Sequence, residues 1–265
     1  MKILVTGVSS GFGRAIARAL AQEGHEVYGT VRKEVEPIAG VTYVRADVTD
    51  DDQVKAAFDH VMELTGGVLD VFINNAGMGI GGPLEFCKTE DVQNQMDVNF
   101  MGMVRWMGGV ICTMRRQGYG KIICISSIGG LMGLPYQGAY SASKFAIEGY
   151  CEALRLELRK SGVQVIVVEP GDFSTGFTAV RKSVEISEAA AAYPSYEKSL
   201  RGIEHDERNG LKPEYLAARI CKIIAKKHPS SSYVVASPLQ LLAVFAKWLL
   251  PAPLFQKILS LYYGV

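Results

Sequence analysis

Residues 2–20 read KILVTGVSSGFGRAIARAL, an apolar run that passes through a glycine-rich turn into a helical pattern. The turn contains Gly7, Gly11 and Gly13. Glycine permits a tight turn and lets backbone N–H groups approach a phosphate, while the N-terminus of the following helix favours an anion. The stretch therefore predicts a phosphate-binding turn between the first strand and the first helix of an α/β fold. Such turns also use glycine for purely geometric reasons, so the rest of the chain has to decide.

Beyond this unit, short β-branched runs alternate with longer helical patterns. The expected strands are residues 2–6, 25–31, 41–46, 69–74, 121–126, 163–169 and 231–236, and the expected helices begin at Phe12, Asp50, Glu90 and Ala139. Nearly continuous apolar strands that alternate with helices predict a parallel sheet covered on both faces. We therefore expect an α/β fold with a Rossmann-like, doubly wound parallel sheet, in a single domain that spans residues 1–265. Gly108 and Gly109 weaken one expected helix by about 1 kcal/mol each, for a reason that the pattern does not show.

Two segments depart from this alternation. Residues 176–212 are long and mostly polar, which predicts a helical insertion over the carboxyl edge of the sheet. Residues 238–265 are the most apolar part of the chain and are expected to form a helical C-terminal extension. The apolar run at 239–250 is too short to span a bilayer, which needs about 20 residues. Three interpretations remain for this extension: a buried helix pair that closes the core, which is favoured, a wall beside a substrate cleft, or an amphipathic patch on a membrane surface.

The overall charge names no macromolecular partner. The 28 Lys and Arg residues against 27 Asp and Glu leave a formal charge of +1, which offers no broad field for nucleic acid or an anionic membrane. The 5 cysteines are an odd number without CxxC spacing, and the chain begins directly with an apolar strand. We therefore expect reduced core thiols and a cytoplasmic protein without a secretory signal.

The end of the second strand indicates which dinucleotide is preferred. A carboxylate at that position would bond an adenosine ribose and repel a 2′-phosphate, whereas a cation would attract the phosphate. The sequence there is YGTVRK, with Val31 at the expected acidic position and Arg32 after it. This favours NADP(H) over NAD(H). The alternative is that Arg32 and Lys33 are solvated charges that open a loop.

Polar residues follow the next strands at the edge where ligands bind in this architecture. They are Asp47 in ADVTD, Asn74 to Gly77 in NNAG, Asn99 in DVNFMG, and Ser126 and Ser127 in ISSIGG. Each can be accounted for structurally, because Asn and Ser are common in turns and helix caps. Their joint occurrence after successive strands predicts a site at the carboxyl edge.

The segment YSASKFAIEGY places Tyr140 and Lys144 one turn apart at the start of an apolar helix face. An unpaired buried ammonium is costly, so Lys144 needs partners. A free tyrosine has a pKa of about 10 and is a poor acid–base catalyst near neutrality unless a cation stabilises its phenolate. The pair therefore predicts proton transfer by Tyr140 assisted by Lys144.

These motifs resemble those of the short-chain dehydrogenase/reductase family. The matching segments are TGVSSGFG (6–13), NNAG (74–77), Asn99, Ser127, YSASK (140–144) and PGDFST (170–175). Ser127, Tyr140 and Lys144 stand in the family's order and spacing, and the resemblance covers nearly the whole chain. Within the family, TVRK, SSIGGLMGLPYQGAYSASKFAIEG and EPG are most similar to the 17β-hydroxysteroid and retinol dehydrogenase branch.

The resemblance implies a role for each site residue. Tyr140 exchanges the proton of a carbonyl or alcohol oxygen, Ser127 holds and polarises that oxygen, and Asn99 positions water for a proton relay behind Lys144. Hydride passes directly to or from nicotinamide, so no metal is expected. The implied cofactor contacts are Gly7, Ser9, Ser10, Gly11, Phe12, Gly13, Arg32, Asp47, Val48, Asn74, Ala76, Gly77, Tyr140, Lys144, Pro170, Gly171, Phe173 and Thr175.

The expected function is NADP(H)-dependent interconversion of a ketone or aldehyde and an alcohol on a lipophilic, steroid-like or retinoid-like substrate. In this interpretation residues 176–212 form the substrate-binding loop. An enzyme of the same family that acts on acyl-carrier-linked or sugar carbonyls is the stronger alternative. A cofactor-sensing regulator is weaker, because the full set Asn99, Ser127, Tyr140 and Lys144 is present.

Two expected helices carry apolar stripes that bear on assembly. The stripes are Phe100, Met103, Val104, Met107 and Ile111, and Ile147, Cys151, Leu154 and Leu158. Packing on the sheet explains either stripe. The resemblance implies a homodimer or tetramer in which these helices pair across a two-fold axis. The expected location is the cytoplasm, with a peripheral membrane contact through residues 238–265 as the alternative.

Overall fold

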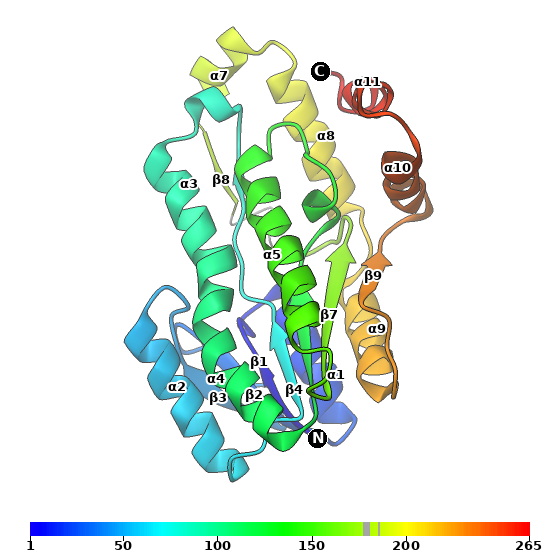
Figure 1. Ribbon diagram of the computed structural model, residues 1–265. Coiled ribbons are helices and arrows are strands. Elements are labelled where there is room, and N and C mark those ends of the chain that lie inside the picture. The colour runs from blue at the N-terminus through cyan, green and yellow to red at the C-terminus, as the bar shows by residue number, and fades with distance from the viewer. Residues whose placement is uncertain (177–180, 185) are drawn as a thin grey trace.

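The computed structural model describes residues 1–176, 181–184 and 186–265. Within this part of the chain, seven parallel strands form one sheet in the order β3-β2-β1-β4-β6-β7-β9 (Figure 1). The strands are β1 (Lys2–Val5), β2 (Glu26–Val31), β3 (Val41–Arg45), β4 (Val71–Asn74), β6 (Gly120–Ile125), β7 (Val163–Pro170) and β9 (Ser232–Val235). The doubly wound α/β sheet predicted from the sequence is confirmed.

Helices cover both faces of this sheet. One face carries α1 (Gly11–Gln22) and α9 (Pro213–Ala225), and the other carries α2 (Asp51–Thr65), α4 (Gly102–Gln117) and α5 (Gly138–Glu157). The remaining helices are α3 (Thr89–Met96), α7 (Ile186–Ala192), α8 (Tyr196–Arg208), α10 (Pro238–Leu249), α11 (Ala252–Tyr263), the π-helix η2 (Asp97–Met101), and the short 3₁₀ helices η1 (Leu84–Phe86) and η3 (Ile128–Gly130).

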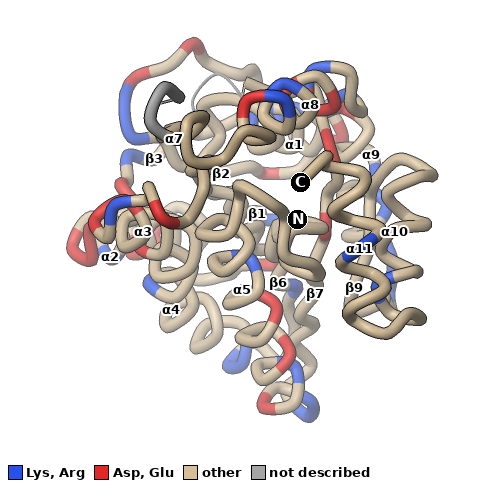
Figure 2. Tube along the Cα trace, turned by 90° about the horizontal axis from the view of Figure 1, so that it is seen from above, with Lys and Arg blue, Asp and Glu red and all other residues tan. Residues whose placement is uncertain are grey.

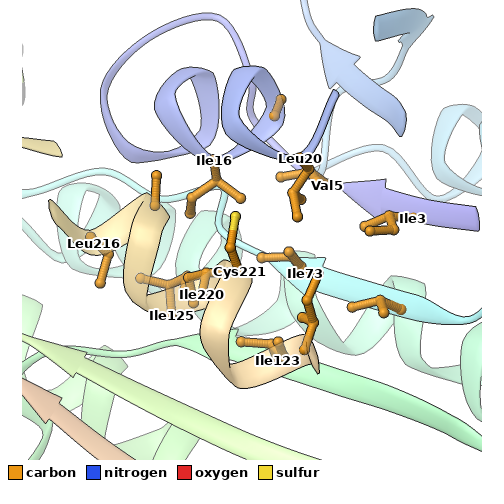
Figure 3. Close-up of a cluster of buried hydrophobic side chains, with 14 of the residues drawn as sticks. Ile3, Val5, Ile16, Leu20, Ile73, Ile123, Ile125, Leu216, Ile220 and Cys221 are labelled. Carbon is orange, nitrogen blue, oxygen red and sulfur yellow. The ribbon is translucent and has the colours of Figure 1, made fainter. Parts of the chain in front are cut away.

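The core divides into two layers because successive strand side chains point to opposite faces. In β1, Ile3 and Val5 pack toward α1 and α9, whereas Leu4 packs toward α4. Figure 3 shows the first layer, in which Ile16 and Leu20 of α1 face Ile220 and Cys221 of α9 above the strands. The sequence interpretation missed α9.

The apolar stripe after Asn99 packs largely within its own chain. Met103 and Met107 are buried against the sheet, and Phe100, Val104 and Ile111 lie partly buried around them. One-sided packing therefore accounts for this stripe. The pairing of α4 and α5 with a second copy stays a prediction.

Gly109 is explained by the approach of α4 to α2. A Cβ at Gly109 would lie 2.6 Å from a ring carbon of Phe58, whereas a Cβ at Gly108 would meet nothing within 4 Å. A side chain at Gly109 would force Phe58 to move, so the glycine permits close helix packing. Nothing in the structure explains Gly108.

Gly109→Ala is expected to be less stable than Gly108→Ala by about 1–3 kcal/mol, because only the first methyl group overlaps with another side chain. Both variants gain the same helix propensity, roughly 1 kcal/mol over glycine, so their difference isolates the overlap. Urea unfolding of the two proteins measures it. Equal free energies of unfolding would contradict the packing explanation.

The chain reverses its winding direction at β1. Strand β1 pairs with β2 on one side and with β4 on the other, so the connections after β1 and β4 diverge at their carboxyl ends. Ligands of doubly wound folds bind at such a point. The topology thus brings the turn at residues 6–13 beside the turn at residues 74–77.

The insertion after β7 contributes secondary structure above this edge. Strand β8 (Lys182–Ser183) pairs in parallel with β5 (Ile80–Gly81), and α8 follows it. Residues 177–180 and 185 of the expected substrate-binding loop lie outside the described residues. The predicted helical character of the insertion is confirmed by α7 and α8.

The favoured interpretation of residues 238–265 as a buried helix pair is wrong. All of α10 and α11 is described, and within them Phe255 alone is buried. The two helices lie beyond the edge strand β9 and follow it directly in the chain (Figure 1). They pack along a narrow apolar seam with Met132 and Leu134, and the rest of their surface is exposed.

Candidate active site

A cavity of about 660 Å³ lies at the carboxyl edge of the sheet. Its walls run from the turn before α1 past the ends of β2 and β3 to the start of α5, and α8 closes the far side. The cavity therefore joins the phosphate-binding turn to Tyr140 and Lys144 in one continuous space.

The turn before α1 has the geometry of a phosphate cradle. Gly7 and Gly11 have φ angles of 72° and 53°, which strain any residue with a side chain. A Cβ at Gly13 would lie 2.2 Å from the carbonyl oxygen of Gly7, so the helix can approach the strand this closely only with glycine. Ser10 precedes α1 without capping it through its side chain, which leaves N–H groups at the helix N-terminus for an anion.

Hydrogen bonds to Thr6 connect this turn to the turn after β4. The Thr6 hydroxyl oxygen accepts hydrogen bonds from the backbone N–H groups of Asn75 (2.9 Å) and Ala76 (3.0 Å). The Asn75 side chain in turn donates to the carbonyl oxygens of Thr6 and Gly7. These contacts hold the two walls of the cavity at a fixed separation.

Arg32 extends from the end of β2 at the rim of the cavity. Val31 and Arg32 both line the cavity, and Arg32 is exposed. Asp47 lies at the end of the neighbouring strand, where burial opposes its ionisation but hydrogen bonds from Thr49 and the nearby Arg32 charge lower its pKa overall. The carboxylate of Asp47 accepts both the backbone N–H (3.0 Å) and the hydroxyl (2.8 Å) of Thr49. The rim at Arg32 is thus a cationic position.

Tyr140 and Ser127 form a hydrogen-bonded pair in the cavity wall. The Ser127 oxygen also accepts from the N–H of Gly129 at 3.0 Å, which fixes its position at the start of η3. Burial raises the pKa of Tyr140 to about 12, and the hydrogen bond from Ser127 opposes that rise. In the protein alone the phenol therefore carries its proton at neutral pH, which is the form that a carbonyl reduction requires.

Lys144 lies one turn further along α5 and is buried. Its ammonium donates to the carbonyl oxygen of Ile125 at 2.9 Å and lies 5.7 Å from the centre of the Tyr140 ring. Burial lowers the pKa of Lys144 to about 8, and the Glu148 carboxylate opposes this shift. The amine is thus mostly charged at neutral pH and near enough to stabilise a phenolate on Tyr140.

Asn99 holds the backbone around the site rather than facing the cavity. Its amide nitrogen donates to the Met78 carbonyl oxygen (3.0 Å) and to the Ser143 hydroxyl (2.9 Å), and its oxygen accepts from the Met78 N–H (2.8 Å). Both amide protons are therefore used within the protein. Asn99 lies in the π-helix η2, a distortion that is frequent at functional sites. Its role in a water relay stays a prediction.

The turn after β7 is fixed by the C-terminal extension. Gln240 in the first turn of α10 accepts from the Asp172 N–H at 3.3 Å and donates to the Asp172 carboxylate at 2.6 Å. A Cβ at Gly171 would lie 2.2 Å from the Gln240 side-chain oxygen. The extension therefore supports the cavity wall, although most of its surface faces outward.

Most residues expected at the site line the cavity. They are Gly7, Ser9, Ser10, Gly11, Phe12, Arg32, Asp47, Val48, Ala76, Gly77, Ser127, Tyr140, Lys144, Pro170, Gly171, Phe173 and Thr175. Gly13 and Asn99 lie behind the wall in the positions described above. Asn74 is the buried last residue of β4 and does not line the cavity, whereas Asn75 does, so the cofactor contact expected of Asn74 stays a prediction.

The cavity is also lined by residues that the sequence interpretation did not name individually as cofactor contacts, several of them from distant segments. The additional lining residues include Thr30, Asn75, Met78, Asn94, Val98, Leu134, Gln137, Asp172, Ile203, Asp206, Glu207 and Tyr263. Asn75 and Asp172 lie within the expected NNAG and PGDFST segments. Ile203, Asp206 and Glu207 come from α8 and Tyr263 from α11, where no motif marks them.

The wall near Tyr140 is acidic on the side of α8. Asp172, Asp206 and Glu207 line the cavity there, and Glu207 forms a buried ion pair with Arg181. Burial, together with the charges of Glu207 and Asp206, raises the pKa of Asp172 to about 6. This region therefore favours a cationic group on a ligand.

Together, a phosphate cradle at the switch point and a Ser–Tyr–Lys set in the same cavity define a nicotinamide-dependent oxidoreductase. Residues 1–185 match the family described as short chain dehydrogenase. The chain belongs to this family of oxidoreductases, whose members bind NAD or NADP.

The curated relatives include three that span most of their own length. The 3-ketodihydrosphingosine reductase of Bacteroides thetaiotaomicron is 47% identical over 99% of this chain and 98% of its own. The NADPH-dependent 3-dehydrocapnine reductase of Ornithobacterium rhinotracheale is 34% identical over 96% and 94%. Retinol dehydrogenase 8 of Bos taurus is 33% identical over 86% and 78%, which agrees with the branch predicted from the sequence.

Solved structures of the family confirm the fold. A short-chain dehydrogenase from Streptomyces avermitilis superposes with a TM-score of 0.82 at 26% identity, covering 99% of this chain and 97% of its own. A short-chain dehydrogenase/reductase from Burkholderia phymatum in complex with NAD has a TM-score of 0.80 at 27% identity, covering 92% of each chain. The likeness extends over the sheet and the helices on both its faces.

Proposed function

We propose that this chain reduces the ketone of a long-chain lipid to an alcohol with NADPH. The observation that carries the proposal is the Ser127–Tyr140 pair beside buried Lys144, in a cavity that joins the phosphate cradle to an acidic and partly apolar wall. Nicotinamide supplies the hydride when it is bound. Side chains of this chain position the carbonyl oxygen and supply its proton.

In the proposed reaction, the Ser127 hydroxyl and the Tyr140 phenol both donate hydrogen bonds to the carbonyl oxygen. The phenol then transfers its proton to that oxygen as the alcohol forms. Lys144 stabilises the resulting phenolate by its charge. Asn99 keeps the start of α5 in place through Ser143, whose hydroxyl also donates to the Tyr140 carbonyl oxygen at 2.7 Å.

The preference for NADPH over NADH is supported by Arg32. Val31 carries no charge that would repel a 2′-phosphate, and the Arg32 guanidinium lies at the cavity rim beside it. The relative named for 3-dehydrocapnine reduction is described as NADPH-dependent. Both observations favour NADPH as the cofactor of this chain.

Arg32→Ala is expected to weaken NADPH binding roughly tenfold and to leave NADH binding nearly unchanged, because only NADPH has the phosphate that the guanidinium attracts. Lys33→Ala is the matched control, since it removes the same charge from the neighbouring residue, which does not line the cavity. Fluorescence titration of both cofactors measures the effect. Equal weakening of NADPH and NADH by Arg32→Ala would overturn the assignment.

The proposed substrate is a long-chain ketone with a cationic amino group near the carbonyl. A relative is named for 3-ketodihydrosphingosine, a molecule with an amino group beside its ketone and a long alkyl chain. The carboxylates of Asp172 and Asp206 would face such an amino group, while Leu134 and Ile203 offer apolar contacts to the chain. Acyl-carrier-linked and sugar carbonyls are the alternatives.

A substrate panel with NADPH separates these classes. The panel consists of 3-ketodihydrosphingosine, the same ketone without its amino group, a ketoacyl carrier and a keto sugar. The proposal predicts the highest kcat/KM for the amino ketone and a lower value for the ketone without nitrogen. A preference for the sugar or the carrier-linked substrate would assign the alternative function.

A further inference from the structure

The C-terminal extension exposes an unusual amount of apolar surface. Of the 19 large hydrophobic residues that are exposed in the described part of the chain, 11 lie in residues 238–265, here called the C-terminal hairpin. The most exposed are Trp248 at 83% and Leu261 at 75%. The hairpin spans α10, α11 and the proline-containing connection between them. An apolar surface gathered in one segment is typical of an interaction site.

The exposed apolar residues lie on a different side of each helix from the apolar residues that pack against the rest of the chain. Ala243, Val244, Ala246, Leu250, Leu259 and Tyr263 form the inner seam against Met132, Leu134 and Phe255. Leu242, Phe245 and Trp248 are exposed at the outer side of α10, and Leu254, Ile258 and Leu261 are exposed on α11. Each helix is therefore apolar on two sides, and the structure buries only one of them.

The charge of the hairpin has one sign. Its charged side chains are Lys247 and Lys257, and residues 238–265 contain no Asp or Glu. Figure 2 shows α10 and α11 at one side of the molecule as largely uncharged segments with isolated basic positions. Lys257 is exposed beside Ile258, whereas the Lys247 ammonium lies 5.5 Å from the centre of the Phe255 ring next to exposed Trp248. Basic residues that accompany exposed apolar side chains are typical of helices in the interfacial layer of an anionic bilayer.

The hairpin also forms part of the cavity wall. Tyr263 at the end of α11 lines the cavity, and its carbonyl oxygen accepts from the Ser199 hydroxyl of α8 at 2.6 Å. The Tyr262 hydroxyl donates to Asp206, another lining residue, at 2.9 Å. Leu134 belongs both to the lining and to the inner seam. A surface that receives the hairpin would therefore lie close to the cavity.

No described helix has the length and apolar character of a membrane span. We propose that the C-terminal hairpin rests in the surface of an anionic lipid bilayer and holds the cavity close to it. The lipid contact goes beyond the proposed function, and the delivery of a membrane-dissolved ketone through it rests on that function. An anionic bilayer fits the surface better than a second copy of the hairpin, because the hairpin contains two lysines and no carboxylate with which they could pair.

Sedimentation with vesicles tests the contact without any substrate. The full chain is mixed with vesicles of phosphatidylcholine alone and of phosphatidylcholine with phosphatidylglycerol. The proposal predicts binding that is stronger to the anionic vesicles, and roughly tenfold weaker for the double variant Leu242→Ser/Trp248→Ser. Leu64→Ser on α2 is the matched control, since Leu64 is also exposed on a helix but lies outside the hairpin. It is expected to bind like the unchanged protein.

Two further readouts distinguish lipid binding from misfolding and from self-association. Circular dichroism and turnover of a short, water-soluble ketone check that the double variant is folded, so loss of vesicle binding does not depend on the substrate assignment. Light scattering compares the oligomeric state of the variant with that of the unchanged protein. The proposal is overturned if the unchanged protein stays in the supernatant, if the double variant binds as strongly, or if the double variant alone becomes a smaller oligomer.

Discussion

Tyr140→Phe is expected to lower kcat by roughly a thousandfold, because it removes the proton that the carbonyl oxygen must receive. The loss is large since the neighbouring groups cannot replace the phenol. Ser127 keeps its position through the Gly129 N–H without Tyr140, and it remains able to polarise the oxygen but not to protonate it at neutral pH. The phenyl ring retains the packing of the tyrosine, so the fold and the cofactor affinity should be nearly unchanged.

The measurement compares turnover, NADPH affinity and thermal unfolding in the variant and the unchanged protein. Tyr136→Phe is the matched control, because Tyr136 loses the same hydroxyl four residues away, where it bonds the Ser195 hydroxyl at 2.9 Å and does not line the cavity. The control should retain activity within a few fold. Near-normal turnover of Tyr140→Phe would rule out the proposed proton transfer.

Lys144→Met is expected to weaken NADPH binding, to reduce kcat by a similar factor of roughly a thousand, and yet to stabilise the protein at neutral pH. Methionine keeps an unbranched stem of similar length but has no charge. The phenolate on Tyr140 then lacks its cation, and the buried site no longer contains an ammonium that burial disfavours. Loss of activity and gain of stability from one substitution distinguish a charged functional group from a structural one.

The sign and the pH range of the stability change follow from the lowered pKa of Lys144. That pKa is about 8 in the folded protein, against the ordinary value of 10.5. Between these values the unfolded chain binds more protons than the folded one, so this lysine makes stability rise with pH. Below pH 8 the buried ammonium of Lys144 lowers the free energy of unfolding by its full amount. Lys144→Met should therefore raise the free energy of unfolding by roughly 2 kcal/mol after the lost hydrogen bond to Ile125 is subtracted.

Unfolding of both proteins without cofactor, measured on either side of that pH range, gives the comparison. The advantage of Lys144→Met should shrink as the pH rises from 8 to 10.5, because the lysine of the unchanged protein then loses its charge. A variant that is destabilised at neutral pH, or an advantage that grows with pH, would contradict a buried ammonium at this position.

The features that local spacing determines were predictable from the sequence. Tyr140 and Lys144 lie on one helix turn, and the parallel sheet follows from apolar strands that alternate with helices. Helix α9 was also predictable, since Pro213 at its first turn and the apolar positions Leu216 and Ile220 mark a helix start and a buried face. The sequence of that segment alone was therefore sufficient to predict α9.

Features that depend on distant contacts were not predictable in this way. Gln240 reaches the turn at Asp172 from a helix that begins many residues later, and no local pattern indicates that contact. Gly109 is required by Phe58 on another helix. The apolar character of residues 238–265 is clear in the sequence, but whether a core covers them depends on the surface that the rest of the chain offers. Local hydropathy predicted burial there, and the structure exposes the segment beside β9.

The central claim is that this site reduces a long-chain ketone with hydride from NADPH. It is tested most directly by incubating the protein with 3-ketodihydrosphingosine and NADPH that carries deuterium at the transferable position of nicotinamide, followed by mass spectrometry of the lipid. The account predicts an alcohol with one deuterium on the carbon of the former carbonyl. An unchanged ketone, or an alcohol without the label, would contradict it.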